Sequence, residues 1–298
     1  MGKSSRRSDA VGAKRESNST TAKISKSPRL AAPEGELYGI APVLEALRAG
    51  HRAIEMVTIA EGARHNRLTE LMGLARAKGI PVHHAPRIAL DRATGNANHQ
   101  GVTAKVAAAK YAEADELLER IGSRFGSNDP PLLVVVDGVV DPRNFGAILR
   151  TAECAGAHGV FTTERRAVGL TETVARTAAG ALEHLPVARV TNLTRLIEEL
   201  KERNIWTVGT SADAATEYTA WDWTVPTAVF FGGEGAGLHR LVRERCDTLV
   251  SIPVRGRIES LNVSVAAGIV LYEAIRQRAL GLHSEARSLS RLHLRRGV

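Results

Sequence analysis

The chain has 298 residues, 44% hydrophobic and only 4% aromatic, so it can hold one large domain or two moderate ones with an aliphatic core. Its two cysteines, Cys154 and Cys246, argue against a disulfide scaffold. Without CxxC or Cys/His ligand spacing they also predict no metal site. No apolar run approaches membrane-spanning length, and the N-terminus lacks the apolar segment of a secretory signal. We therefore expect a cytoplasmic protein, with a transit peptide as the weaker alternative.

The formal net charge of +8 is concentrated at the two ends. Residues 1–33 hold eight Lys or Arg against two acids, and residues 279–298 hold four Arg against one Glu, which leaves −1 for the body. Basic ends with few apolar residues cannot bury enough surface to fold alone. We expect them to be mobile arms attracted to a polyanion such as RNA, the alternative being a leader that only aids solubility.

The chain divides into a disordered basic arm (1–33), a small domain (34–106), a linker (107–130), a main domain (131–280) and a basic tail (281–298). The linker is polar and helix-prone at 110–121 and rich in Gly, Ser and Pro after that. In the small domain, apolar patterns predict helices at 42–48 and 66–78 and strands at 54–60, 81–84 and 102–106. This alternation is typical of an α/β sandwich.

Strand and helix patterns alternate more regularly in the main domain. Its strand-like runs are almost continuously apolar, as expected for strands covered by helices on both faces. The pattern predicts a mostly parallel, doubly wound α/β sheet, with strands at 132–136, 159–162, 187–190, 206–209, 228–231 and 248–252, and helices at 144–155, 172–181, 193–203, 238–245 and 263–278.

Three stretches lie where a predicted strand ends and a predicted helix begins: DPRNFGAILRTA at 141–152, FGGEGAG at 231–237 and IPVRGRIESLNVSV at 252–265. Ligands bind at such edges of an α/β sheet, so the three together predict a ligand site. The glycine stretch matches neither the dinucleotide fingerprint nor the P-loop, which disfavours ordinary NAD and NTP binding. A plain tight turn is the alternative for this stretch.

Polar residues in these stretches are candidates for chemistry. Arg150 could hold a phosphate or stabilise an oxyanion, or it could form a surface ion pair. Asn144 could bind a ligand or cap its helix. Ser260, Asn262 and Ser264 offer donors and acceptors to a small ligand, or they cap the last helix.

Together the stretches resemble the three motifs of the SpoU (TrmH-type) RNA 2′-O-ribose methyltransferases of the SPOUT superfamily. The patterns N-x-G-x-x-x-R-T-A, G-x-E-G-x-G and I-P-x-x-G-x-x-x-S-L-N-V-S-V-A stand at 144–152, 232–237 and 252–266. The small domain is similar to the family's L30e-like substrate-binding domain. The subgroup that the chain resembles most methylates a 23S rRNA guanosine in the peptidyl-transferase region. The same chemistry on tRNA or on the thiostrepton-loop adenosine stays open, as does a non-catalytic RNA-binding ribosome-assembly factor.

The resemblance implies a homodimer whose C-terminal part forms a trefoil knot and holds S-adenosylmethionine largely by backbone groups. By motif position, those contacts fall on Gly232, Ile252 and Leu261, while Gly235 shapes the loop. Periodicity itself shows no knot, and folds with knots are rare.

The resemblance also implies methyl transfer to a ribose 2′-hydroxyl, with Arg150 in the leading role. Because a guanidinium stays protonated up to about pH 12, we interpret Arg150 as a group that grips RNA phosphate and stabilises the developing alkoxide. Asn144, Ser260 and Asn262 would orient ribose and cofactor. Glu234 would fix the loop or assist the proton.

Further basic and amide groups predict RNA contacts in the small domain, where arginines could hold phosphates and Asn, Gln and His could read base edges. The alternative for each of these residues, taken alone, is that it is a solvent-exposed surface residue without a binding role. The set comprises His51, Arg52, Arg64, His65, Arg67, Arg87 and the stretch 96–101. One departure from the family pattern is the basic sequence at 254–257, VRGR, which could add a phosphate contact or alter dimer packing.

Overall fold

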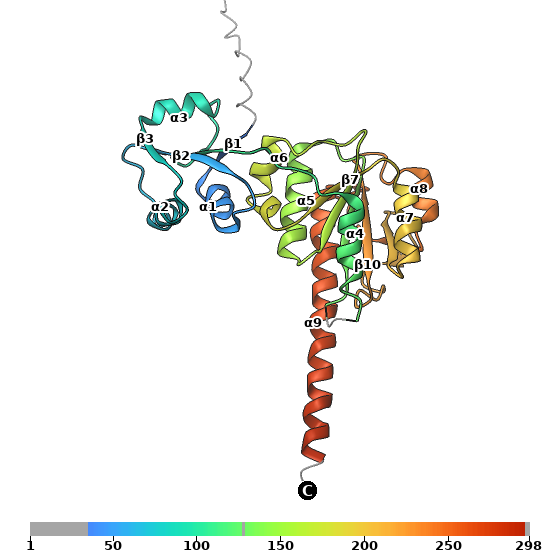
Figure 1. Ribbon diagram of the computed structural model, residues 1–298. Coiled ribbons are helices and arrows are strands. Elements are labelled where there is room, and N and C mark those ends of the chain that lie inside the picture. Colours follow the sequence, from blue (N-terminus) through green and yellow to red (C-terminus); the bar gives the residue numbers. More distant parts are fainter. Residues whose placement is uncertain (1–34, 127–128, 296–298) are drawn as a thin grey trace, which may run out of the picture. The chain divides into compact units, whose positions relative to one another are not determined.

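The computed structural model describes residues 35–126 and 129–295, and the basic arm predicted at 1–33 lies outside them. The described chain forms a 4-stranded sheet followed by a 7-stranded sheet. Figure 1 shows both, with the helices packed against them. In the described residues, no helix is both long and apolar enough to cross a membrane.

The smaller sheet has the strand order β1-β4-β2-β3, in which β4 is antiparallel to β1 and β2, and β2 is parallel to β3. Apolar faces of its helices pack on it to form a core of their own. The elements are β1 (Glu36–Tyr38), α1 (Ile40–Ala49), β2 (Ile54–Ala60), α2 (Leu68–Ala77), β3 (Val82–Ala85), α3 (Arg87–Ala93) and β4 (Val102–Val106).

The strands predicted at 54–60 and 102–106 are confirmed residue for residue, and the two predicted helices and the third strand are confirmed within a few residues. β1 and α3 were not predicted from the sequence. β1 has only three residues, too few for a period of two to be visible. α3 has seven residues and buries only Leu90, so it lacks the apolar stripe that identifies longer helices.

The larger sheet is parallel throughout, in the order β7-β6-β5-β10-β8-β11-β9. This confirms the predicted α/β class. The six predicted strands are all present, and only the two-residue β9 was not predicted. The strands are β5 (Leu132–Asp137), β6 (Gly159–Thr163), β7 (Val187–Val190), β8 (Trp206–Thr210), β9 (Thr216–Glu217), β10 (Thr227–Gly232) and β11 (Thr248–Ser251).

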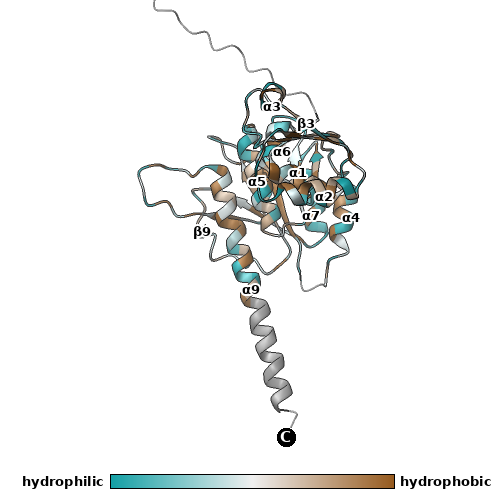
Figure 2. Cartoon of the chain, turned by 90° about the vertical axis from the view of Figure 1, so that its left-hand side faces the viewer, coloured by the Kyte–Doolittle hydropathy of each residue, from teal (hydrophilic) through white to brown (hydrophobic). Residues whose placement is uncertain are grey.

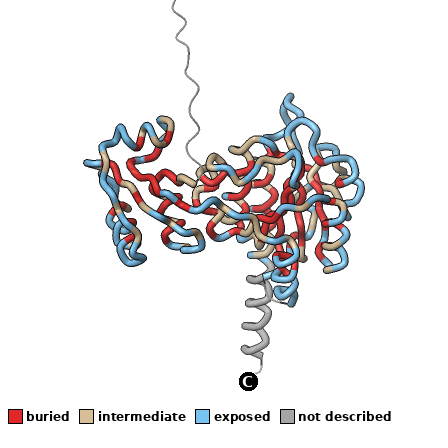
Figure 3. Tube along the Cα trace, turned by 45° about the horizontal axis from the view of Figure 1, so that its top comes forward, coloured by how far each residue is buried: buried red, intermediate tan, exposed pale blue. Residues whose placement is uncertain are grey.

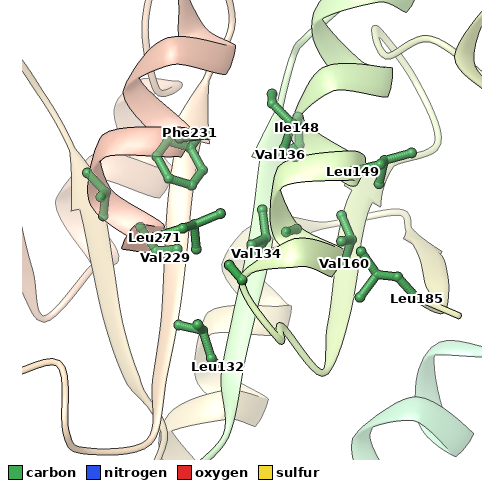
Figure 4. Close-up of a cluster of buried hydrophobic side chains, with 14 of the residues drawn as sticks. Leu132, Val134, Val136, Ile148, Leu149, Val160, Leu185, Val229, Phe231 and Leu271 are labelled. Atoms are coloured by element: carbon green, nitrogen blue, oxygen red, sulfur yellow. The ribbon is translucent and has the colours of Figure 1, made fainter. Parts of the chain in front are cut away.

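Helices cover both faces of this sheet. One face packs on α5 (Pro142–Cys154), α6 (Glu172–Thr177) and α9 (Val263–Arg295), and the other on α4 (Ala114–Gly122), α7 (Leu193–Glu202) and α8 (Arg240–Arg245). Within β5, Leu132, Val134 and Val136 face the first set, while Leu133 and Val135 face the second. Figure 4 shows the first cluster, and Figure 3 shows the buried strands inside exposed loops.

Three helices differ most from the expected boundaries, and one of them is α6, which ends at Thr177 and not at 181. α4 forms from the helix-prone part of the predicted linker, and its Leu117, Leu118 and Ile121 are buried in the core of the main sheet. α9 begins at Val263 as predicted but continues to Arg295, well past the expected end at 278. Figure 2 shows hydrophobic and hydrophilic segments along its coloured part, where the buried residues include Ala267, Val270 and Leu271.

Candidate active site

A cavity of about 560 Å³ lies at the carboxyl ends of β8, β10 and β11. These strands are neighbours in the parallel sheet, so the loops that follow them meet at one edge. The volume is within the range of small-molecule sites. Three segments contribute most of the lining: 210–213, 231–238 and 259–263.

The glycine loop after β10 brings its backbone against the cavity. A Cβ added to Gly232 would lie 2.0 Å from the carbonyl carbon of Gly237, and one added to Gly233 would lie 2.3 Å from the carbonyl oxygen of Gly138. The loop folds back on itself, because the N–H of Gly237 donates to the carbonyl of Gly233 at 3.0 Å. Gly235 has φ of +86°, a left-handed conformation that favours glycine. Side chains larger than hydrogen therefore cannot occupy the narrow part of the loop.

Three polar side chains from distant parts of the chain form one hydrogen-bonded series beside this loop. The Asn144 amide nitrogen donates to Glu234 Oε1, and the Asn262 amide nitrogen donates to Asn144 Oδ1 at 3.0 Å. Asn144 and Asn262 are 118 residues apart. The first stretch thus meets the other two stretches at the same edge of the sheet.

Asn144 and Asn262 differ in their relation to helix capping: Asn144 does not cap α5, whereas Asn262 caps α9. Asp141, not Asn144, caps α5, since its Oδ1 accepts from the N–H groups of Arg143 and Asn144 at 2.6 and 3.3 Å. The side chain of Asn144 is therefore released for contacts across the site. Asn262 both caps α9, by accepting from Ser264 N at 2.9 Å, and reaches Asn144 with its amide nitrogen.

The predicted site residues fall into two groups. Seven of them line the cavity: Gly232, Glu234, Gly235, Ile252, Ser260, Leu261 and Asn262. Asn144 is bonded to two of these. Arg150 does not line the cavity: it is exposed on α5 and has no hydrogen-bond or ion-pair partner among the described residues. The structure brings together all the predicted residues except Arg150.

The cavity wall that follows β8 was not predicted from the sequence. There Asp213 accepts from Ser211 Oγ at 2.5 Å and from Arg243 Nη2 at 2.7 Å. The hydrogen bond from Ser211, followed by that from Arg243, lowers the pKa of Asp213 to about 2. The wall therefore carries a permanent negative charge paired with an arginine. Residues 210–213 have no recognisable motif, and only the position of β8 between β10 and β11 would have indicated them.

No group of three or more His, Cys, Asp or Glu in the described part of the chain is arranged to hold a metal ion. The cavity is lined by backbone groups, apolar side chains, hydroxyl and amide side chains, and the charged residues Asp213, Glu234, Arg243 and Glu259. Such a set can enclose a polar or charged small molecule and orient a hydroxyl next to it.

Comparison with known proteins identifies the family. Residues 131–272 match the SpoU rRNA Methylase family, and residues 37–112 match the family model described as RNA 2′-O ribose methyltransferase substrate binding. The putative TrmH family tRNA/rRNA methyltransferase YacO of Bacillus subtilis is 45% identical over 79% of this chain and 93% of its own. The 23S rRNA (guanosine-2′-O-)-methyltransferase RlmB of Ralstonia nicotianae is 44% identical over 82% of this chain and 96% of its own.

A solved structure shares the fold. The SpoU methyltransferase AviRb of Streptomyces viridochromogenes, in complex with AdoMet, superposes with a TM-score of 0.67 at 27% identity, covering 82% of this chain and 91% of that chain. The same family is indicated by the two family models, by relatives that are similar over nearly their full length, and by this solved structure. The chain therefore belongs to the SpoU (TrmH-type) family of RNA 2′-O-ribose methyltransferases.

Proposed function

We propose that this protein transfers a methyl group from S-adenosylmethionine to the ribose 2′-hydroxyl of a guanosine in 23S rRNA. The observation that carries the proposal is the junction of the glycine-loop cavity with the Asn144–Glu234–Asn262 series at one edge of the sheet. The relative named RlmB supports the nucleotide, and AviRb in complex with AdoMet supports the cofactor. An rRNA substrate also supports a cytoplasmic location.

The cavity fits S-adenosylmethionine. Gly232 and Gly233 leave no room for a Cβ because neighbouring backbone fills that space, so the loop is tightly packed where it borders the cavity. Ile252 and Leu261 supply apolar surface opposite, and Gly235 permits the turn. When bound, this cofactor supplies an electrophilic methyl group on a sulfonium. We assign Gly232, Gly235, Ile252 and Leu261 to its binding.

The residues around the cavity mouth would prepare the ribose. Asn144 and Asn262 hold each other and would fix the direction of the hydroxyl, with Ser260 beside them. Glu234 is held by Asn144 and would fix the loop or accept the proton. Arg150, free of protein partners in the described chain, would bind the adjacent phosphate and stabilise the alkoxide as its proton leaves.

An exposed apolar face supports a homodimer. Val265 and Tyr272 lie seven residues apart on α9, hence on the same side of the helix, and are 51% and 52% exposed. Leu261, before the helix, and Val140, before α5, are 41% and 61% exposed. A second copy of the chain would cover this face next to the cavity. Tyr272→Asp should then shift the protein from dimer to monomer in sedimentation velocity.

The domain limits belong to the same proposal. We assign residues 34–106 to RNA binding, 107–113 to the connection and 114–280 to methyl transfer, because α4 packs in the core of the main sheet and not in a linker. Residues 1–33 and 281–298 would be basic extensions with affinity for RNA. Family membership supports a trefoil knot, which is part of this proposal as well.

Mapping of 2′-O-methyl groups tests the function directly. Ribosomal RNA and tRNA from a strain lacking the gene are compared with those from the parent strain and from a strain complemented with Arg150→Ala. Loss of one 23S guanosine methyl group, restored only by the wild-type gene, is expected. Loss of a 2′-O-methyl group at a tRNA position, or at an adenosine of 23S rRNA, would show that this nucleotide is the substrate instead. If calorimetry detects no binding of S-adenosylmethionine, the protein is a non-catalytic assembly factor.

A further inference from the structure

A second, smaller cavity lies in the first domain, outside the site described above. Its volume is about 270 Å³, and it opens where the parallel strands β2 and β3 end and α2 begins. Ile59 of β2 pairs with His84 of β3, and both line the cavity. The other lining residues are Ala60, Gly62, Ala63, Arg64, His65, Leu68, Thr69 and Met72.

The floor and the rim of this cavity differ in chemistry. Ile59 and Leu68 are 3% and 7% exposed and belong to the domain core, so the floor is apolar. Met72 is 37% exposed and gives the floor a soft, polarizable edge. Arg64, His65 and His84 are exposed around it. No Asp or Glu is among the described residues that line the cavity.

The polar side chains at the rim, Arg64, His65 and His84, have hydrogen-bonding groups that are available to a ligand. The side chains of Arg64 and His84 have no hydrogen-bond or ion-pair partner in the described part of the chain. His65 Nδ1 accepts from the N–H of Arg67 at 3.1 Å, so a neutral His65 carries its proton on Nε2 and can donate it outward. Apolar lining residues beside exposed imidazole rings and a guanidinium match the recognition of an unpaired nucleotide: stacking for the base and a cation for the phosphate.

We propose that this cavity binds one unpaired nucleobase of the RNA substrate, stacked on His84 and Met72, with the neighbouring phosphate on Arg64. The proposal rests on the proposed function for the identity of the polymer, and the family match over residues 37–112 supports RNA as the occupant. The cavity would anchor a nucleotide other than the one being methylated. It would thereby contribute to the choice of substrate without touching the reacting atoms.

Matched variants separate this site from general electrostatic attraction. His83 precedes His84 on β3 and therefore points to the opposite face of the strand. Arg76 lies at the other end of α2 from Arg64. His83→Ala and Arg76→Ala thus remove the same groups outside the cavity. All four residues are exposed, so none of the substitutions should unfold the protein.

The probes are single-stranded oligoadenylate and an abasic ribose-phosphate oligomer of equal length, bound to the full chain and followed by fluorescence anisotropy. Wild type and both controls should bind oligoadenylate more tightly than the abasic oligomer. His84→Ala should lose most of that preference, about tenfold for one stacked base. Arg64→Ala should weaken both probes alike and reduce the salt slope of log K by about 0.7, the contribution of one phosphate on a single strand.

Methyl transfer to a 23S rRNA transcript gives the second measurement. The KM for RNA should rise about tenfold in His84→Ala, while kcat and S-adenosylmethionine binding stay at wild-type values. An unchanged base preference in His84→Ala, or an equal loss in His83→Ala, would overturn the cavity proposal even if methylation is normal. Absence of methylation by the wild type would overturn the proposed function, and the binding comparison would still decide whether the cavity holds a base.

Discussion

His239 binds the carboxylate of Asp137 twice: its backbone N–H donates to Oδ2 at 2.8 Å, and its ring Nδ1 lies 2.7 Å from Oδ1. Asp137 is the last residue of β5 and is 2% exposed, while His239 follows the glycine loop and leads into α8. The two residues are 102 positions apart. The pair therefore fixes the exit of the glycine loop to the neighbouring strand β5.

We expect Asp137→Ala to lower the free energy of unfolding by about 2–3 kcal/mol, because it removes hydrogen bonds to a buried charged group and leaves the His239 N–H unpaired. His239→Ala keeps the backbone bond and loses only a half-exposed ring, so its cost should be below about 1 kcal/mol. Urea unfolding, followed by tryptophan fluorescence, measures both. Equal losses in the two variants would show that the ring, not the backbone, carries the contact.

Arg150→Ala should reduce kcat at least about 100-fold, because the developing alkoxide and the adjacent phosphate lose their cation. Binding of S-adenosylmethionine should be nearly unchanged, since Arg150 lies outside the cavity lining. Arg143→Ala, which removes another exposed arginine from the same helix, is the control. Calorimetry and tritiated methyl transfer give the two readouts. Wild-type turnover in Arg150→Ala would remove this residue from the mechanism.

The two roles of Asn262 can be separated by substitution. Asn262→Asp retains the oxygen that caps α9 but replaces the amide donor to Asn144 with a second carboxylate near Glu234. Its melting temperature should stay close to wild type while activity falls. Asn262→Ala loses both functions and should cost about 1 kcal/mol of stability as well. If Asn262→Asp retains full activity, the amide contact to Asn144 has no part in catalysis.

Two glycines of the same loop should respond differently to a methyl group. Gly232→Ala would place Cβ inside the backbone at Gly237, so the loop must open, and we expect S-adenosylmethionine binding to be lost. In Gly235→Ala the added Cβ has no atom within 4 Å, so the only cost is the unfavourable φ of +86°. The φ strain should cost about 1–3 kcal/mol and weaken binding without abolishing it. Differential scanning calorimetry and cofactor titration distinguish the two outcomes.

The main sheet was predictable because its strands are buried on both faces. β5 and β10, for example, are continuous apolar runs ended by Asp137 and by glycine, and their observed limits lie within one residue of the prediction. α4 was only partly foreseen: Leu117, Leu118 and Ile121 form a correct helical stripe, but polar residues around them made the segment resemble a linker. A pattern of three apolar residues does not reveal which surface they cover.

The site was predictable residue by residue but not as an arrangement. Motifs identified Asn144, Glu234 and Asn262 separately, whereas their contact depends on β10 lying next to β5, which no local pattern encodes. Asp213 and Arg243 were missed for the same reason, since they belong to the site only through strand order. Alternation along a strand predicts which faces are buried, but neighbours in a parallel sheet are set by long-range packing.

The last prediction concerns pH. Burial, reinforced by nearby Glu36, raises the pKa of Glu172 from 4.5 to about 7, and Glu172 Oε1 is buried without a hydrogen-bond partner in the described structure. Between these pKa values the folded protein keeps a proton that the unfolded chain has released, so stability falls as pH rises from about 4.5 to about 7. Glu172→Gln removes this loss. The variant should melt higher than wild type at pH 8 and close to it at pH 5, whereas Glu164→Gln, at an exposed position, should follow wild type throughout. Thermal unfolding curves at several pH values decide the matter, and parallel pH profiles for wild type and Glu172→Gln would contradict the predicted protonation of Glu172.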